Sequence, residues 1–295
     1  MTVAPCSIII RTFNEARHLP ELLASIASQD HPADRREVVV VDSGSTDGTI
    51  DIASRAGCRI HRIDKDRFSF GRSLNEGCAA SSGDLLVCVS GHCVPTDTQW
   101  LSRLVAPFSD PSVGATYGRQ VGGPATRFSE HQIFAKYFPN GGPSQSAFFT
   151  NNANSAWRRD AWQRFRFDED LTGLEDMHLG RRVVQSGLRV QYVAEAAVHH
   201  HHHESWVQVR RRYFREAVAL REVMPELHLY ASEAARFFAA AVMGDLARAL
   251  SERRALRLAP EIIMFRFNQY LGAWQGNSLH RKLSSREKYL YFYPS

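Results

Sequence analysis

Short runs of β-branched residues alternate with amphipathic stretches along the first half of the chain. Residues 6–11 and 37–41 are typical of strands, and the valines of the second run lack the polar alternation of a half-exposed strand. Between these runs, residues 15–28 place four leucine and isoleucine side chains on one face of a helix. This pattern predicts βαβ units around a mostly parallel sheet, with residues 37–41 as a central strand covered on both faces.

The same pattern continues along the chain, except in its middle. Further strands are predicted at 59–63, 85–89, 114–117 and 189–193, and further helices at 47–56, 72–81, 100–108 and 174–186. Residues 118–154 are rich in Gly, Pro, Asn, Ser and Phe and predict a long functional loop region with short elements. After the five histidines at 199–203, Ser205 is placed to cap a helix, and a second helix is predicted to open at Ser232.

The charge is distributed unevenly along an ordinary globular composition. The chain has 36 Lys and Arg against 31 Asp and Glu, 44% hydrophobic and 23% charged residues, which argues against disorder, collagen-like repeats and a coiled coil. Residues 205–295 hold 15 Lys and Arg and 8 Asp and Glu, a net charge of +7, which leaves −2 on residues 1–204. A cationic helix with an apolar face suits an anionic membrane surface, and packing on the rest of the chain or in a homodimer is the alternative. No nucleic-acid-binding motif accompanies the arginines, so we expect no nucleic-acid partner.

Cysteine usage points to a reducing compartment. The five cysteines form an odd set without a CxxC pair in a chain too large to need disulfides, so we expect free thiols. The N-terminal residues predict no signal peptide, and no stretch approaches the roughly 20 apolar residues that span a bilayer. We therefore expect a cytoplasmic protein, with association at the inner face of the membrane left open.

Polar clusters follow three of the predicted strands. The residues are Arg11 to Glu15 after the first strand, Asp42 to Thr49 after the second, and Ser90 to Pro95 after residues 85–89. In an open parallel sheet, ligands bind outside the carboxyl ends of the strands, where a Gly-rich turn admits a ligand close to the backbone. The three strand ends therefore predict one shared crevice, although Asp42 to Thr49 alone could equally be a tight turn with Asp47 capping a helix.

An ordered set of segments resembles the family 2 glycosyltransferases with the GT-A fold, and the bacterial rhamnosyltransferase-like branch in particular. The segments are SIIIRTFNE at 7–15, VVVDSGSTDGT at 39–49, GRSLN at 71–75, GDLLV at 83–87, YGRQ at 117–120, NNANSA at 151–156, Glu175-Asp176, and the histidines ahead of Arg212-Tyr213. The resemblance covers roughly residues 5–220 and implies a Rossmann-like, mostly parallel sheet flanked by helices with a C-terminal helical extension. It implies a catalytic domain at 1–204, divided into a nucleotide-sugar part at about 1–118 and an acceptor and catalytic part at about 119–204, followed by a basic helical extension at 205–295.

The resemblance also implies the donor-binding residues. The matching positions are Thr12, Phe13, Asn14, Glu15, Asp42, Gly44, Ser45, Arg72, Asn75 and Ser90. Asp42 would read the base or ribose of the nucleotide, and Asn75 would lie near its diphosphate. Leu74 stands where many family members have Arg, so Arg72 would contact the phosphates instead.

The metal motif departs from the family pattern. Members usually carry Asp-x-Asp after the fourth strand, which supplies oxygen ligands for Mg²⁺ or Mn²⁺ beside substrate phosphates. The matching positions here are Ser90, Gly91 and His92. An imidazole is an acceptable ligand for Mn²⁺ and a poor one for Mg²⁺, so a divalent cation is expected, with Mn²⁺ favoured. Two alternatives stay open: a metal held by His92 with a later histidine, or a transferase that stabilises the leaving group without a metal.

The histidine run bears on that choice. The family's His-x-His pair would fall on His200 and His202, and alternate residues of an extended segment face the same way. We therefore expect His92, His200 and His202 as metal ligands, and the other histidines of the run as a solvated loop.

The catalytic expectation falls on Asp176. A general base must be ionised and must reach the acceptor hydroxyl, which suits a carboxylate at the start of a helix. The resemblance assigns this role to Asp176, with Glu175 beside it on the acceptor or the sugar. Asn152 and Asn154 offer amide groups for sugar hydroxyls, Trp157 a stacking face, and Trp162 is assigned to the core.

These observations favour an inverting glycosyltransferase that moves a hexosyl or deoxyhexosyl group from a nucleotide sugar to a hydroxyl of a glycan or lipid-linked acceptor, as in bacterial surface polysaccharide synthesis. The alternative is a catalytically impaired nucleotide-sugar or glycan binding module, motivated by the missing Asp-x-Asp. A histidine-rich metal hydrolase is the weakest reading, because no HExxH spacing is present.

Overall fold

The computed structural model describes residues 4–142, 146–279 and 287 of the chain. These residues form two compact units. The first unit comprises residues 1–123, 137–170 and 175–201, and the second comprises 124–136, 171–174 and 202–295. The second unit thus contains the helices after Ser205 and also takes in residues 124–136, 171–174 and 202–204, which the sequence analysis placed in the catalytic domain.

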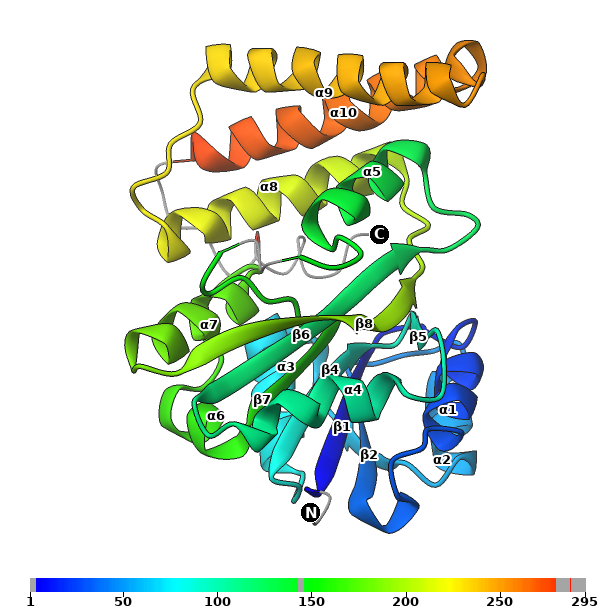
Figure 1. Cartoon of the computed structure of the whole chain (residues 1–295), viewed down its shortest axis with the longest axis vertical. Helices are drawn as coiled ribbons and strands as arrows, with labels where there is room; N and C mark the ends of the chain where they lie inside the picture. Colours follow the sequence, from blue (N-terminus) through cyan, green and yellow to red (C-terminus); the bar gives the residue numbers. More distant parts are fainter. Residues whose placement is uncertain (1–3, 143–145, 280–286, 288–295) are drawn as a thin grey trace. The chain divides into compact units, whose positions relative to one another are not determined.

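The first unit is built on one eight-stranded sheet with the order β3-β2-β1-β4-β7-β6-β8-β5 (Figure 1). The strands are β1 (Cys6–Thr12), β2 (Arg36–Asp42), β3 (Arg59–Arg62), β4 (Leu85–Ser90), β5 (Cys93–Pro95), β6 (Val113–Gly122), β7 (Asn154–Arg158) and β8 (Arg189–His200). The first four form parallel pairs, whereas β7 runs antiparallel to both β4 and β6. The expected mostly parallel sheet is therefore confirmed.

Helices cover both faces of the parallel half of this sheet. The helices of the unit are α1 (Leu19–Ala27), α2 (Thr49–Arg55), α3 (Phe70–Ala79), α4 (Trp100–Val105), α6 (Arg159–Phe165) and α7 (Glu175–Gln185), with single turns at Ala33–Arg35, Lys65–Arg67 and Ala106–Ser109. Ile8 and Ile10 point into the cluster that contains α1, α2 and α4, whereas Ile9 faces α3. The valines at 39–41 are fully buried in β2, which confirms a strand covered on both faces.

The predicted loop region at 118–154 holds short elements, as expected: the end of β6, the helix α5 (Phe128–Tyr137) and the first residue of β7. One strand prediction is wrong in extent. The predicted strand at 189–193 extends to His200, because β6 pairs with one edge of β8 and β5 with the other. Strand pairing from distant parts of the chain overrides the weak local preference of the Ala- and His-rich segment.

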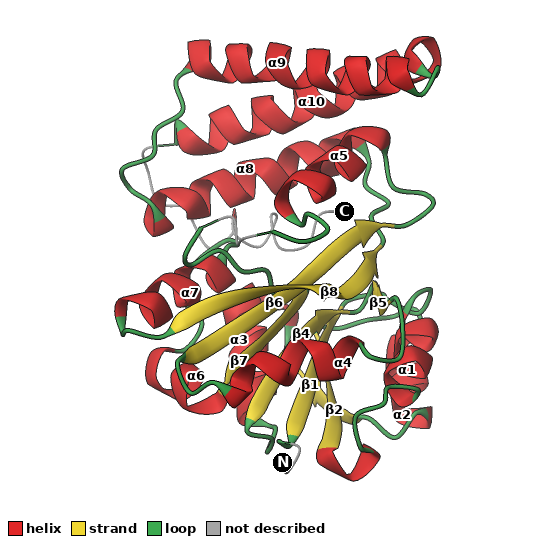
Figure 2. Cartoon of the chain, viewed as in Figure 1, coloured by secondary structure: helices red, strands yellow, loops and turns green. Residues whose placement is uncertain are grey.

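The second unit is helical (Figure 2). It contains α5, α8 (Trp206–Val223), α9 (Ala231–Ser251) and α10 (Ala255–Asn277). Ser205 accepts the N–H of Gln208 and forms a capping box with it, so the predicted cap is confirmed. Gly272 and Gly276 let α10 approach α8 closely, since an added Cβ would lie 2.3 and 2.2 Å from carbonyl oxygens of α8. Within the described ranges, no helix combines the length and the apolar character needed to cross a bilayer.

Candidate active site

The carboxyl ends of β2, β1 and β4 lie side by side in the sheet. Thr12 is in register with Asp42, and Arg11 is in register with Ser90. The three polar clusters predicted to share a crevice therefore do meet at one edge of the sheet, in the first unit. This edge is where ligands bind in open parallel sheets.

Asp42 organises the turn that follows β2. The residue is buried, and its Oδ1 accepts the N–H groups of Gly44 and Ser45, each at 2.9 Å. Its Oδ2 accepts the hydroxyls of Ser45 at 2.5 Å and Thr12 at 3.1 Å. Because four protein donors hold the carboxylate, Asp42 fixes the shape of the turn, and any contact with a ligand has to share oxygens already in use.

Asn14 joins the turn after β1 to the turn after β2. Its backbone is left-handed, with φ of 57°, a conformation that Asn tolerates better than most residues. Its N–H donates to Ser45 Oγ at 2.8 Å, and its Oδ1 accepts the Thr46 N–H at 2.9 Å. Asp47 adds a further link, since its Oδ2 accepts the Ala16 N–H at 2.9 Å. The two turns therefore form one hydrogen-bonded wall of the crevice.

Lys65 is a candidate that the sequence analysis missed. Its Nζ lies 4.8 Å from the centre of the Phe13 ring, and its side chain lies close to Gly44. Lys65 follows β3, the next parallel strand in the sheet, so the same strand-end reasoning that selected Asp42 would have found it.

Arg72 and Asn75 both contact Glu169. Arg72 Nε donates to Glu169 Oε2 at 2.8 Å, and the guanidinium remains about one-third exposed. Asn75 is buried and donates to Glu169 Oε1 and the Phe167 carbonyl, while its Oδ1 accepts the Trp162 Nε1–H and the Phe167 N–H. All donors and acceptors of the Asn75 amide are used, which gives Asn75 a structural role that anchors α3, and a diphosphate contact would have to share these hydrogen bonds.

His92 and His200 face each other across the edge of the sheet. Their Nε2 atoms are 3.2 Å apart. His92 Nδ1 lies 2.6 Å from Glu15 Oε1, and His200 Nδ1 lies 2.7 Å from Gln120 Oε1. Because a carboxylate and an amide oxygen only accept hydrogen bonds, each Nδ1 donates to its oxygen, which leaves the two Nε2 atoms to share a proton or to offer lone pairs to a metal ion.

This arrangement fits a cation. Two imidazole lone pairs that face each other at 3.2 Å repel unless a proton or a metal ion shares them. Oxygen acceptors behind the Nδ1 atoms are the partners that orient metal-binding histidines in proteins. Gly91 leaves room for the Glu15 side chain beside His92, since a Cβ added at Gly91 would lie 2.8 Å from the Glu15 side chain.

The third expected ligand, His202, belongs to the second unit. There its Nδ1 lies 2.6 Å from Glu130 Oε1. Arg212 bridges Glu130 at 2.6 Å and Glu204 at 2.7 Å. The other histidines of the run differ, since His199 is exposed and His201 stacks on His18 with ring centres 4.8 Å apart.

Asp176 lies buried at the first turn of α7. Its Oδ2 accepts the Asn152 N–H at 2.9 Å, and its Oδ1 accepts the Met177 N–H at 2.7 Å. Burial raises the pKa of Asp176 to about 7, and the adjacent Glu175 charge adds to this shift. Glu175 is also buried and lies 3.6 Å from the Arg11 guanidinium, of which Nη1 is buried without a hydrogen bond. A carboxylate with this pKa can take up and release a proton near neutral pH.

The three expected acceptor residues have different surroundings. Asn154 and Trp157 are wholly buried: the Asn154 amide bonds Trp100 Nε1 and the carbonyls of Arg119 and Ala196, and Trp157 Nε1 donates to Asn152. Neither side chain is exposed in this structure, so sugar contacts by Asn154 and Trp157 stay a prediction that these hydrogen bonds do not support. Trp162 is buried as expected.

Asn152 differs from its neighbours. Its Oδ1 accepts from Ser155 and Trp157, and its N–H holds Asp176, but its Nδ2 is buried without a partner. A buried amide donor left unpaired beside a titratable carboxylate is the kind of group that a ligand hydroxyl satisfies.

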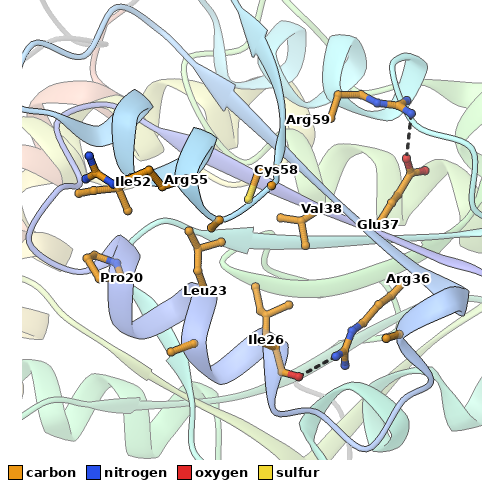
Figure 3. A pocket seen from close by; sticks show the side chains of 15 residues that line it. Pro20, Leu23, Ile26, Arg36, Glu37, Val38, Ile52, Arg55, Cys58 and Arg59 are labelled. Carbon is orange, nitrogen blue, oxygen red and sulfur yellow. Dashed lines mark hydrogen bonds and ion pairs between the residues drawn. The ribbon is translucent and has the colours of Figure 1, made fainter.

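A hollow lies elsewhere in the first unit (Figure 3). It has a volume of about 1050 Å³ between α1 and α2, with Leu23, Ile26, Val38 and Cys58 pointing into it. Its sheet residues come from the amino-terminal ends of β2 and β3, away from the carboxyl ends that carry the crevice. The hollow is therefore distinct from the candidate active site.

The sequence is similar to those of known glycosyltransferases. The sequence is 29% identical over 227 residues to the O-antigen chain rhamnosyltransferase RfbN of Salmonella typhimurium, covering 72% of this chain and 71% of that protein. It is 34% identical over 152 residues to the glycosyltransferase AglE of Haloferax volcanii, covering 49% of this chain and 45% of that protein.

Solved structures share the fold. The mannosyltransferase PcManGT of Pyrobaculum calidifontis, solved with GDP-Man and Mn²⁺, superposes with a TM-score of 0.64 at 20% identity, over 92% of this chain and 87% of that one. The glucosyl-3-phosphoglycerate synthase of Mycobacterium tuberculosis, solved with Mn²⁺ and UDP, gives a TM-score of 0.55 at 18% identity, over 75% of this chain and 80% of that one. The model of the family described as "Glycosyl transferase family 2" matches residues 7–172, more than half of the chain. The chain therefore belongs to glycosyl transferase family 2 and is a glycosyltransferase with the GT-A fold.

Proposed function

We propose that the protein is an inverting glycosyltransferase that transfers a sugar from a nucleotide sugar to a hydroxyl group of a glycan or lipid-linked acceptor, with Asp176 as the general base. The observation that carries this proposal is the environment of Asp176. Its carboxyl is buried and fixed by backbone donors at both oxygens, and its pKa is raised to about 7. A base with a pKa near the working pH is the most effective in proton transfer.

The reaction is a single displacement. Asp176 takes the proton of the acceptor hydroxyl, whose oxygen forms a bond to the anomeric carbon of the donor sugar. The bond between that carbon and the diphosphate breaks on the opposite face, and the nucleoside diphosphate leaves with the electron pair. The unpartnered Asn152 Nδ2 supports the proposal, because it supplies a donor for a sugar hydroxyl beside Asp176.

The donor would lie along the crevice at the ends of β1, β2 and β4. Lys65 and Arg72 supply cationic groups near this edge, and the wall formed by Asn14, Ser45 and Asp47 gives it a fixed shape. A positive charge in place before the reaction stabilises the departing diphosphate.

His92 and His200 would hold a divalent cation, which would neutralise charge on the leaving diphosphate. Imidazole nitrogens favour Mn²⁺ over Mg²⁺. The solved relatives support a divalent cation, since PcManGT and the mycobacterial synthase were crystallised with Mn²⁺. His202 remains a predicted third ligand on the strength of its place two residues after His200.

The acceptor class follows from the relatives. RfbN and the protein WbaN of Salmonella anatum are O-antigen chain rhamnosyltransferases, which supports a role in bacterial surface polysaccharide synthesis. All five cysteines are free thiols, which is compatible with a reducing compartment.

The experiment is a panel of nucleotide sugars tested for binding and turnover, with and without Mn²⁺, on wild type, Asp176→Asn and the matched control Glu175→Gln. Turnover that disappears in Asp176→Asn while donor binding persists supports the proposal. Donor binding without turnover by the wild type, with its acceptor supplied, would instead identify a nucleotide-sugar binding module.

A further inference from the structure

The α9–α10 hairpin of the second unit exposes an unusual number of large apolar side chains. Among the residues that the structure describes, eleven large hydrophobic side chains are exposed, and seven of them lie on these two helices. The seven are Phe237, Met243, Leu250, Leu256, Ile263, Met264 and Phe267. Single exposed apolar residues are ordinary, but their gathering on two adjacent helices marks an interaction surface.

These side chains form a stripe on each helix. On α10, the exposed residues Leu256, Pro260, Ile263 and Phe267 recur at helical spacing. On α9, the exposed residues Ala240, Met243, Ala247 and Leu250 do the same. Each helix therefore has a second apolar face in addition to the one it buries, because other residues, such as Ala249 and Ile262, pack inside the unit.

The tip of the hairpin combines this apolar surface with positive charge. Leu256 is 97% exposed and Leu250 is 69% exposed. The tip residues 248–257 also hold four exposed arginines and one glutamate. The arginines are Arg248, Arg253, Arg254 and Arg257. Leucines that protrude among arginines suit a lipid surface, which has an apolar interior under a layer of anionic headgroups.

We propose that the hairpin tip and the two stripes dock on an anionic phospholipid surface, with the leucines between headgroups and acyl chains and the arginines against the phosphates. The charge argues for lipid rather than a second copy of the chain, because a two-fold contact through the tip would bring two groups of arginines together. This inference concerns a surface and goes beyond the proposed reaction.

The test uses the full chain and sedimentation with vesicles. One set of vesicles is phosphatidylcholine alone, and the other is equal parts phosphatidylcholine and phosphatidylglycerol. Wild type is expected to bind the anionic vesicles, and the double variant Leu250→Ser/Leu256→Ser to bind them roughly tenfold more weakly or worse. The control Val207→Ser, an exposed residue on α8, is expected to bind like wild type.

A second pair of variants tests the charge. Arg253→Gln/Arg257→Gln is expected to lose the preference for anionic vesicles by roughly tenfold. The control Arg55→Gln/Arg62→Gln removes two exposed arginines from the first unit and is expected to keep the wild-type preference for anionic vesicles. Circular dichroism of each variant checks the fold.

Three results would overturn the proposal. The first is a wild type that stays in the supernatant with anionic vesicles, and the second is a leucine variant that binds as wild type does. The third is a dimer in sedimentation velocity that the leucine variant lacks, which would assign the stripes to a second copy. Turnover on a soluble acceptor reports on the reaction separately, so failure of the surface and failure of the proposed function are distinguishable.

Discussion

His92 and His200 place their Nε2 atoms 3.2 Å apart, with each ring held from behind by an oxygen acceptor. When both rings are neutral, their Nε2 lone pairs repel each other, and a cation between them removes this repulsion. His92 stands at a position where family members usually carry an Asp of Asp-x-Asp, whereas His200 falls on the family's His-x-His pair, so a neutral nitrogen takes the place of a charged oxygen at one position. This replacement lowers the negative charge of the site, and because imidazole nitrogen is a poor ligand for Mg²⁺, we expect Mn²⁺ to bind better.

The histidine pair predicts how the enzyme responds to metal removal. After dialysis against a chelator, turnover is expected to fall and to recover with Mn²⁺ at lower concentrations than with Mg²⁺. His92→Ala is expected to raise the Mn²⁺ concentration for half-maximal turnover at least tenfold, as measured by titration. The exposed neighbour His199 gives the control His199→Ala. Metal-independent turnover that survives His92→Ala would contradict the ligand assignment.

Asp176→Asn is expected to lower kcat by about 10² to 10⁴ while leaving donor affinity unchanged, because only the proton acceptor is lost. Steady-state kinetics and calorimetric binding of the nucleotide measure the two quantities. Glu175→Gln keeps the proton acceptor and is expected to cost less. Loss of donor binding in the Asp176 variant would assign this residue to the donor site instead.

As the proposed base, Asp176 would set the acid limb of the pH profile. The ionised form accepts the proton, and the pKa is raised to about 7, so kcat/KM is expected to rise with pH through about 7 and to level off above it. Glu175→Gln removes a negative charge that raises this pKa, so the limb is expected to move to lower pH. A profile that stays flat between about pH 5 and 8 would rule out this assignment.

The same carboxyl affects stability. A folded pKa above the unfolded value means that ionisation destabilises the fold, and this cost grows as the pH rises from the ordinary carboxyl range through about 7. At pH 8, the free energy of unfolding of Asp176→Asn is therefore expected to exceed that of wild type by up to about 4 kcal/mol. Near pH 4, the two free energies of unfolding are expected to be similar. Chemical denaturation at the two pH values measures the difference, and equal differences would contradict it.

On α3, we expect Asn75 to have a structural role and Arg72 a donor-binding role, and variants of the two residues distinguish these roles. Asn75→Ala leaves the buried Trp162 Nε1–H and Phe167 N–H without an acceptor, so the free energy of unfolding is expected to fall by about 2 to 4 kcal/mol. The KM for the donor is expected to stay within about twofold, because the Asn75 amide is fully used inside the protein. Arg72→Ala is expected to raise the KM for the donor and to leave the free energy of unfolding nearly unchanged. A donor KM that rises only in the Asn75 variant would support the diphosphate contact predicted for Asn75.

Much of the fold could be predicted from local patterns. The valines of β2 and the apolar face of α1 indicate their burial directly, and the strand-end clusters indicate which segments meet. The antiparallel β7 and the long β8 could not be predicted, because both are held by partners distant in sequence. The segment around His200 has no local preference for a strand until β5 and β6 lie beside it.

The site shows a similar division. Residue types and order selected Asp176 and His92, since their chemistry is visible in the sequence. The sequence did not distinguish Asn152, with its unpartnered Nδ2, from the wholly buried Asn154 two residues later. Which amide has a spare donor depends on packing around Trp100 and Trp157, and that packing is a property of the assembled sheet.

The hydrogen bonds of Asn14 and Asp47 across the two strand-end turns have a consequence for the kinetics of donor capture. Loops that are tied to each other by side chains have already lost their conformational entropy when the chain folds. A nucleotide entering this side of the crevice does not have to order them, so more of its contact energy remains as affinity. Association on this side is then limited by diffusion and charge rather than by a slow rearrangement of the protein.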